Sequence, residues 1–236
     1  MLATALPDRR LGAIDPVLLV ILPLAMAVAI VGPFDRNIQI ITSGDPLLRV
    51  ASIAVVVVAG AVFAQQSGLS LLGNSARWPW IGMGCAIGVA MYVCLIDAFL
   101  FRSDLPLSYL HEIQGQGLKE RLSYYFLRAF QENIIYRLFL YSALAWLFCR
   151  LRRTSATELT IVQAISIALV VQLVNVLSNT VSLEPASAIV PVYYAVRFVV
   201  PGTLWGFLYW RFGFATTELG HVACHAFLQP ALGALL

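Results

Sequence analysis

Long, uninterrupted apolar runs restrict the fold of this chain more than any other feature. Each run is close to the roughly 20 residues that cross the hydrocarbon core of a bilayer as a helix. Backbone polar groups in hydrocarbon must be satisfied within the protein, and continuous hydrophobicity favours helices over a barrel. The sequence therefore predicts an all-α, polytopic transmembrane helical bundle with about seven spans, within a range of six to eight. The candidate spans are 16–32, 47–64, 79–101, 122–149, 157–181, 187–211 and 213–236.

The composition agrees with a membrane protein. Hydrophobic residues make up 60% of the 236 residues and charged residues only 11%, a balance outside that of soluble globular domains. The net charge is +3, and no basic stripe with interleaved aromatics predicts nucleic acid as a partner. Because the sequence has no internal repeat, we predict a single integral-membrane domain over 1–236. The expected location is a bacterial-type cytoplasmic membrane. The four cysteines lack paired spacing and are expected to be packing thiols rather than a disulfide or zinc framework.

Basic residues predict the orientation. The densest cluster is "CRLRRT" at Cys149–Thr154, which the positive-inside rule places in the cytoplasm. With seven spans, Arg9 and Arg10 near the N-terminus fall on the same side. The connector at 102–121 gives a contrary signal because its three basic residues, Arg102, Lys119 and Arg121, would then lie outside.

The connector at 102–121 is polar, but apolar residues recur along it at Leu105, Leu107, Leu110, Ile113 and Leu118. One interpretation is a short amphipathic segment lying at the membrane interface before the fourth span. The alternative is a solvated loop.

The fourth span carries charged residues in an apolar setting. Each charged group at membrane depth costs roughly 2.5–3.5 kcal/mol even on a lenient insertion scale. Residues three or four apart share a helix face, so Arg128 is predicted to reach Glu132, and Asn133 to reach Arg137. These pairs either hold neighbouring helices together or form part of a site.

Two further spans present polar stripes. The last span carries an acid and two imidazoles at i, i+3 and i+7, and the fifth carries three amides at similar spacing. Buried polar groups must be hydrogen-bonded, although single amides often serve only helix association. We therefore predict that three polar faces converge on one cavity inside the bundle. The stripes are Glu218, His221 and His225, and Gln172, Asn175 and Asn179.

The sixth span is interrupted. Pro191 and Pro201 divide it, so a re-entrant piece followed by a shorter helix is an alternative to one span. Arg197 lies deep within it and is expected either to pair with Asp97 or Glu184 or to hold a substrate carboxylate.

The order of these motifs resembles the CAAX protease and bacteriocin-processing family of intramembrane proteases. The resemblance covers about residues 120–229, in Glu-Asn-x-x-x-Arg, Val-x-x-x-Asn and "PGTLWGFLYWRFGFATTELGHVACH". The family patterns are Glu-Glu-x-x-x-Arg, Phe-x-x-x-His and His-x-x-x-Asn. The resemblance implies a glutamate-type endopeptidase without an obligatory metal, in which Glu132 activates water and Arg137 and His221 fill motif positions. It implies a membrane-embedded protein or peptide as the substrate, cleaved near its C-terminus.

Three positions depart from the family pattern. Asn133 replaces a second glutamate, Asn175 stands where the family has histidine, and His225 stands where it has asparagine. The last two changes are reciprocal, so the inventory of one acid, two imidazoles and one carboxamide is kept. We hypothesise that the histidine and the carboxamide have exchanged helices. His221 would hold water or protonate the leaving amine, and Asn175 or His225 would donate to the oxyanion.

Other functions are compatible with the same residues. Glu132, His221 and His225 form a two-histidine, one-carboxylate set that could hold zinc, although no cofactor is expected. The departures also fit a catalytically silent relative that binds a peptide or lipid tail in an immunity, scaffold or chaperone role. Transport is a fourth candidate, because the sixth span is broken. The supporting residues expected around the site are Asn133, Arg128, Glu218, Gln172 and Asn179.

Overall fold

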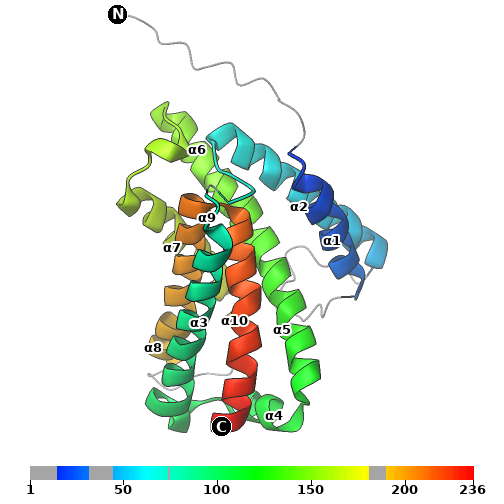
Figure 1. Ribbon diagram of the computed structural model, residues 1–236, viewed down its shortest axis with the longest axis vertical. Coiled ribbons are helices and arrows are strands. Elements are labelled where there is room, and N and C mark those ends of the chain that lie inside the picture. Colours follow the sequence, from blue (N-terminus) through cyan, green and yellow to red (C-terminus); the bar gives the residue numbers. More distant parts are fainter. Residues whose placement is uncertain (1–14, 32–44, 74, 181–189) are drawn as a thin grey trace, which may run out of the picture.

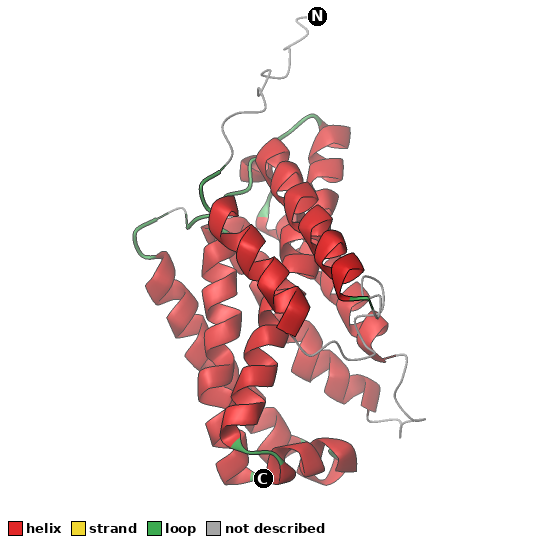
Figure 2. Cartoon of the chain, turned by 90° about the vertical axis from the view of Figure 1, so that its right-hand side faces the viewer, coloured by secondary structure: helices red, strands yellow, loops and turns green. Residues whose placement is uncertain are grey.

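The computed structural model describes residues 15–31, 45–73, 75–180 and 190–236, and every regular element in these ranges is helical (Figures 1 and 2). The all-α class is therefore confirmed. Arg9, Arg10 and Glu184 lie outside the described residues. The principal helices are α1 (Leu18–Val31), α2 (Pro46–Ser67), α3 (Trp78–Leu95), α4 (Leu107–Gly115), α5 (Leu118–Glu132), α6 (Ser142–Arg152), α7 (Ile161–Thr180), α8 (Val190–Tyr194), α9 (Val200–Phe212) and α10 (Phe214–Leu235).

Within these ranges, four helical stretches are long and apolar enough to cross a membrane: Pro46–Ser67, Trp78–Leu100, Leu118–Arg152 and Ile161–Ser178. The structure therefore supports a helical membrane bundle, and the count of seven spans is not confirmed. The first predicted span becomes α1, which has only 14 residues. The last becomes α10, which is long enough, but polar residues such as His221 lower its hydropathy.

In the described part of the chain, three helical segments are π-helical. They are η2 (Ile96–Leu100), which continues α3, η4 (Asn133–Tyr141), which joins α5 to α6, and η6 (Ala195–Val199), which joins α8 to α9. A π-helix bonds each residue to the fifth one along, and such segments often occur at functional sites. Each of the three contains a buried or half-buried charged residue, respectively Asp97, Arg137 and Arg197.

Helix α10 runs through the middle of the bundle and packs against α3, α5 and α9 (Figure 1). Two glycines permit the close approach of α3 and α10. A Cβ on Gly82 would lie 2.9 Å from the Thr216 carbonyl oxygen, and one on Gly220 would lie 3.1 Å from the Gly82 carbonyl oxygen. This central position places both histidines of α10 among neighbouring helices rather than at the lipid-facing surface.

The connector contains the short helix α4, together with a 3-10 turn (Arg102–Asp104). Ile113 is buried in the core between α4, α3 and α10, whereas Leu107 on the same helix is 73% exposed. An amphipathic helix thus forms here rather than an irregular loop, and Figure 1 shows it beside the C-terminus at one end of the bundle.

Arg121 fixes α4 and α10 to α5. Its side chain is buried, and its guanidinium donates to the carbonyl oxygens of Ile113 and, at 3.3 Å, of Gln229. The guanidinium of Arg121 is therefore bound inside the protein. Its positive charge does not indicate on which side of the membrane the connector lies. Its position at the C-terminal end of α4 also favours a cation, because the helix dipole is negative there.

Replacing Arg121 with alanine is expected to lower the free energy of unfolding by about 2 kcal/mol, because two carbonyls lose a charged donor. Chemical unfolding of the detergent-solubilised chain, followed by circular dichroism, measures the change. Lys119→Ala, at an exposed position on the same helix, is the matched control. Equal stability of the two variants would contradict the assigned role.

Candidate functional site

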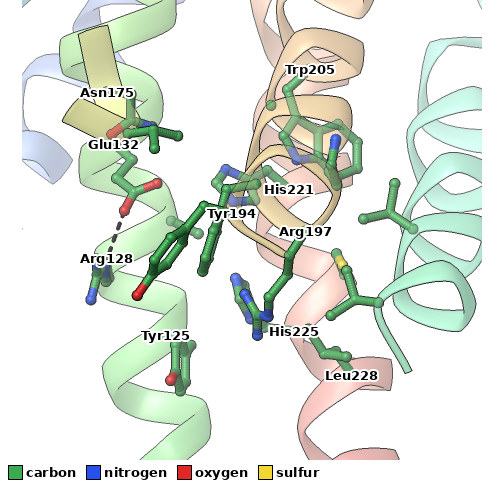
Figure 3. A pocket seen from close by; sticks show the side chains of 18 of the residues that line it. Tyr125, Arg128, Glu132, Asn175, Tyr194, Arg197, Trp205, His221, His225 and Leu228 are labelled. Carbon is green, nitrogen blue, oxygen red and sulfur yellow. Dashed lines mark hydrogen bonds and ion pairs between the residues drawn. The ribbon is translucent and has the colours of Figure 1, made fainter. Parts of the chain in front are cut away.

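A cavity of about 430 Å³ opens between the helices of the bundle (Figure 3), a size typical of small-molecule and peptide-end sites. Side chains from α3, α4, α5, α7, α8, α9 and α10 line it. Seven residues predicted from the sequence are in its wall: Arg128, Glu132, Arg137, Gln172, Asn175, His221 and His225. The structure thus brings the acid, the carboxamide and both imidazoles of the hypothesised site to one cavity. Their catalytic roles stay a prediction.

Glu132 is held by the predicted pair on α5. Arg128 Nε donates to Glu132 Oε1 at 3.0 Å, and Arg128 Nη1 donates to the Tyr124 hydroxyl at 2.9 Å. The second oxygen, Glu132 Oε2, makes no hydrogen bond among the described residues and is not fully buried. One carboxylate oxygen is therefore fixed, and the other is open to the cavity.

Asn133 orients His221. His221 Nδ1 lies 3.1 Å from Asn133 Oδ1. An amide oxygen only accepts hydrogen bonds, so His221 Nδ1 carries the proton and Nε2 is the acceptor. His221 Nε2 makes no hydrogen bond within the described part of the chain and is not fully buried. The imidazole therefore presents a lone pair to the cavity.

Both histidines belong to an aromatic column. Trp205 stacks on His221 with ring centroids 5.5 Å apart, and Tyr125 stacks on His225 at 5.0 Å. The two imidazoles are 5.7 Å apart and tilted by 40°. His225 Nδ1 is buried and has no hydrogen-bond partner among the described residues. The column, Trp205–His221–His225–Tyr125, fixes both ring planes by packing.

The predicted contact between Asn133 and Arg137 is wrong. Arg137 Nη2 donates to Gln172 Oε1 at 2.6 Å and to the Gly202 carbonyl oxygen at 3.4 Å. Each of the two side chains has a partner on another helix instead. Asn133 turns to α10 and Arg137 to α7 and α9. The bonds of Arg137 thus link three helical segments, and Asn175 Nδ2, 3.4 Å from the same Gln172 oxygen, extends the polar network along α7.

Gly202 allows Gln172 to reach Arg137. A Cβ at position 202 would overlap the Gln172 side chain. We expect Gly202→Ala to displace Gln172, remove the acceptor from the wholly buried Arg137 and lower the free energy of unfolding by about 1–3 kcal/mol. Chemical unfolding in detergent measures this, with Gly88→Ala as the control because a Cβ there meets no neighbour. Unchanged stability of Gly202→Ala would contradict the link.

Glu218 is not in the cavity wall. Both Glu218 carboxylate oxygens are buried behind Asn133, with whose side chain Glu218 interacts, although no hydrogen bond of normal geometry joins them. Glu218 shares a face with His225 but lies about 10 Å away along the helix axis, since each residue advances 1.5 Å. Glu218 therefore lies outside the cavity wall and next to Asn133, and its supporting role stays a prediction. The Asn179 side chain lies outside what the structure describes.

A second polar cluster adjoins the cavity. Asp97 has no exposed surface and accepts hydrogen bonds from Arg197 Nε at 2.9 Å, Tyr109 Oη at 2.8 Å and Tyr193 Oη at 3.1 Å. Of the two partners considered for Arg197, the described structure shows Asp97. Burial raises the pKa of the Tyr109 hydroxyl on α4 above its ordinary value, so it remains a donor at neutral pH.

Sequence reasoning missed the aromatic wall. Tyr109, Tyr124, Tyr125 and Trp205 all line the cavity, but aromatic residues are common in apolar helices and show no distinctive spacing here. The pairing of tyrosines at 124–125 beside Arg128 was the one available signal.

The zinc alternative gains no support from the geometry. Within the described ranges, no group of three or more His, Cys, Asp or Glu side chains is arranged to hold a metal ion. The four cysteines are free thiols, as expected from their spacing. Zinc analysis of the purified protein by mass spectrometry would test the alternative directly.

Comparisons with known proteins assign no function to this chain. Membership of the CAAX protease and bacteriocin-processing family stays a prediction that rests on the motif positions alone. No protein-family model, curated protein or solved structure matches the chain.

Proposed function

We propose that this protein is an integral-membrane endopeptidase that cleaves a membrane-embedded protein or peptide near its C-terminus, with water activated by Glu132. One observation carries the proposal. An open carboxylate oxygen on α5 and an open imidazole nitrogen on α10 face the same cavity inside a helical membrane bundle. A base with space for a water molecule beside it is the first requirement of peptide hydrolysis.

In the proposed reaction, Glu132 Oε2 accepts a proton from water as the water oxygen attacks the scissile carbonyl carbon. His221 Nε2 accepts the second hydrogen bond of that water and so orients it. Collapse of the tetrahedral intermediate breaks the carbon–nitrogen bond, and the proton held by Glu132 passes to the leaving amine. His225 or Asn175 donates to the oxyanion, in keeping with the hypothesis that these two residue types have exchanged helices.

The neighbouring residues would preorganise this chemistry. Arg128 fixes one oxygen of Glu132, so the other is directed to the cavity. Asn133 sets the tautomer of His221, and Trp205 fixes its ring plane. Groups that are already in position lower the activation free energy, because they need no reorganisation during the reaction.

Comparison of membrane proteomes tests the proposal. Cells that lack the protein would be complemented with wild type, Glu132→Gln or the control Glu120→Gln, at an exposed position on the same helix. We expect a membrane protein shortened near its C-terminus in cells with wild type or Glu120→Gln, and uncut in cells with Glu132→Gln. Identical C-terminal peptides in all three strains would exclude the proposal.

A catalytically silent binding protein is the second candidate. The ion pair between Arg128 and Glu132 favours it, because ion pairs between residues one helical turn apart also occur with a purely structural role. In this function the cavity would hold a peptide or lipid tail without cleaving it. A Glu132→Ala strain indistinguishable from wild type, with retained peptide binding by the purified variant, would support this candidate over the first.

A further inference from the structure

We propose that Arg197 forms a subsite for the free C-terminal carboxylate of the peptide substrate. This inference deepens the proposed function and rests on it for the cleavage step, but the binding that it predicts can be measured without cleavage. The substrate class is then a peptide whose own C-terminus enters the cavity, rather than an internal loop or a chain that continues beyond the site.

Two of the five guanidinium N–H groups of Arg197 are bonded within the protein, behind the cavity. Nε donates to both Asp97 oxygens at 2.9 Å, and one Nη2 hydrogen goes to the Tyr109 hydroxyl at 3.0 Å. Nη1 makes no hydrogen bond among the described residues and is not among the fully buried atoms. Because Arg197 is in the cavity wall, Nη1 presents two N–H groups to that space.

Aromatic rings hold the guanidinium in place. Arg197 Cζ lies 4.5 Å from the centroid of the Phe198 ring and 5.3 Å from that of Tyr109. Arginine stacked in this way and fixed by a carboxylate behind it loses little entropy on binding an anion. Charge-assisted bonds from a guanidinium to a carboxylate are among the stronger hydrogen bonds in proteins.

The charges around the cavity leave room for an anion. Asp97 lies behind Arg197 with no exposed surface, and Arg128 is paired with Glu132. Glu112, at the α4 side, accepts a hydrogen bond from the Tyr125 hydroxyl at 2.9 Å. Among the charged residues in the wall, Arg128, Arg137 and Arg197 oppose Glu112 and Glu132, so the wall carries an excess of one positive charge.

The position of Arg197 suits a peptide end. Figure 3 shows Arg197 beside His225, with Glu132 across the cavity on α5. A chain terminus bound to Arg197 would extend past the aromatic column toward Glu132 and His221. The carboxylate would therefore fix which peptide bond, counted from the C-terminus, reaches the open oxygen of Glu132.

The test uses the full chain carrying Glu132→Gln, in phosphatidylcholine nanodiscs, so that binding is read without turnover. The probes are two fluorescein-labelled apolar hexapeptides of one sequence, one ending in a carboxylate and the other in an amide. We expect the carboxylate form to bind at least tenfold more tightly by fluorescence anisotropy. Equal binding of the two forms, including no binding by either, overturns the proposal.

Variants locate the preference. Asp97→Asn combined with Arg197→Gln removes both charges together, so no unpaired charge remains buried, and it should bring the carboxylate peptide to the affinity of the amide peptide. Arg102→Gln, an exposed arginine at the same end of the bundle, should keep the tenfold preference. If the double variant still prefers the carboxylate peptide, the proposal is overturned. It is also overturned if the chain with Asp97 and Arg197 intact loses this preference in nanodiscs that contain phosphatidylglycerol, since a lipid headgroup would then occupy the subsite.

The outcomes separate this inference from the proposed function. A carboxylate preference without any cleavage by wild type retains the subsite and excludes the peptidase. Cleavage that depends on Glu132 but is equally fast for both peptides retains the peptidase and excludes the subsite.

Discussion

Asp97→Ala is expected to lower the free energy of unfolding by roughly 3–5 kcal/mol, because it leaves a buried arginine without its counter-ion. Asp97 has no exposed surface, and it accepts hydrogen bonds from Arg197, Tyr109 and Tyr193. Its removal therefore leaves the Arg197 guanidinium and the hydroxyls of Tyr109 and Tyr193 without this acceptor. Chemical unfolding in detergent, followed by circular dichroism, gives the size of the loss.

The double variant Asp97→Ala with Arg197→Met separates charge from packing. Removal of both partners leaves no unpaired charge, so most of the lost stability should return. Asp104→Ala, at an exposed position near the end of α3, is the control and should change stability little. A single variant as stable as this control would show that the cluster does not stabilise the fold.

His221→Ala is expected to reduce cleavage of the substrate tail about 10²-fold, because the attacking water loses the acceptor that orients it, and misplacement of reacting groups by about 1 Å can cost this much. The residue offers its Nε2 lone pair to the cavity and contacts Asn133 through Nδ1. The rate is measured as the appearance of the shortened tail in membranes that contain equal amounts of each variant. His111→Ala changes the exposed histidine of α4 and should leave the rate unchanged.

Asn133→Leu tests how His221 is held. It removes the acceptor of the Nδ1 proton, so a smaller loss of rate is expected, and His221→Ala in the same background should add less than it does alone. Strictly multiplicative losses would indicate that the two residues act independently.

The helices could be predicted because hydrophobicity in a membrane has few structural solutions. The expected span at 47–64 is α2, Pro46–Ser67, and that at 79–101 is α3 with η2, Trp78–Leu100. The number of crossings was harder to predict, since it depends on how much polarity a helix tolerates when its neighbours shield it. The burial of Arg121 could not be predicted either, because both of its carbonyl partners come from other helices.

The site was predictable where local spacing determines contacts. Arg128 and Glu132 are one α-helical turn apart and pair as expected. The rule failed at Asn133 and Arg137, because each has its partner on another helix. Asp97 and Arg197 lie 100 positions apart, so only the fold could choose between Asp97 and Glu184 as the partner. Asn133 was predicted to contact Arg137, and its contact with His221, 88 positions away, could be found only from the fold.

The π-helical segment η4 joins α5 to α6. The rotation of α6 about the helix axis, relative to α5, therefore depends on the number of residues in η4. Successive residues of an α-helix are about 100° apart, so deletion of a single residue within 133–141 would permit regular α-helix and swing Arg137 away from Gln172. Apart from Arg137, no residue of this stretch lines the cavity. One-residue deletions along this stretch would thus change the orientation of Arg137 and α6. Glu132 precedes the stretch, so its own position on α5 would be unchanged.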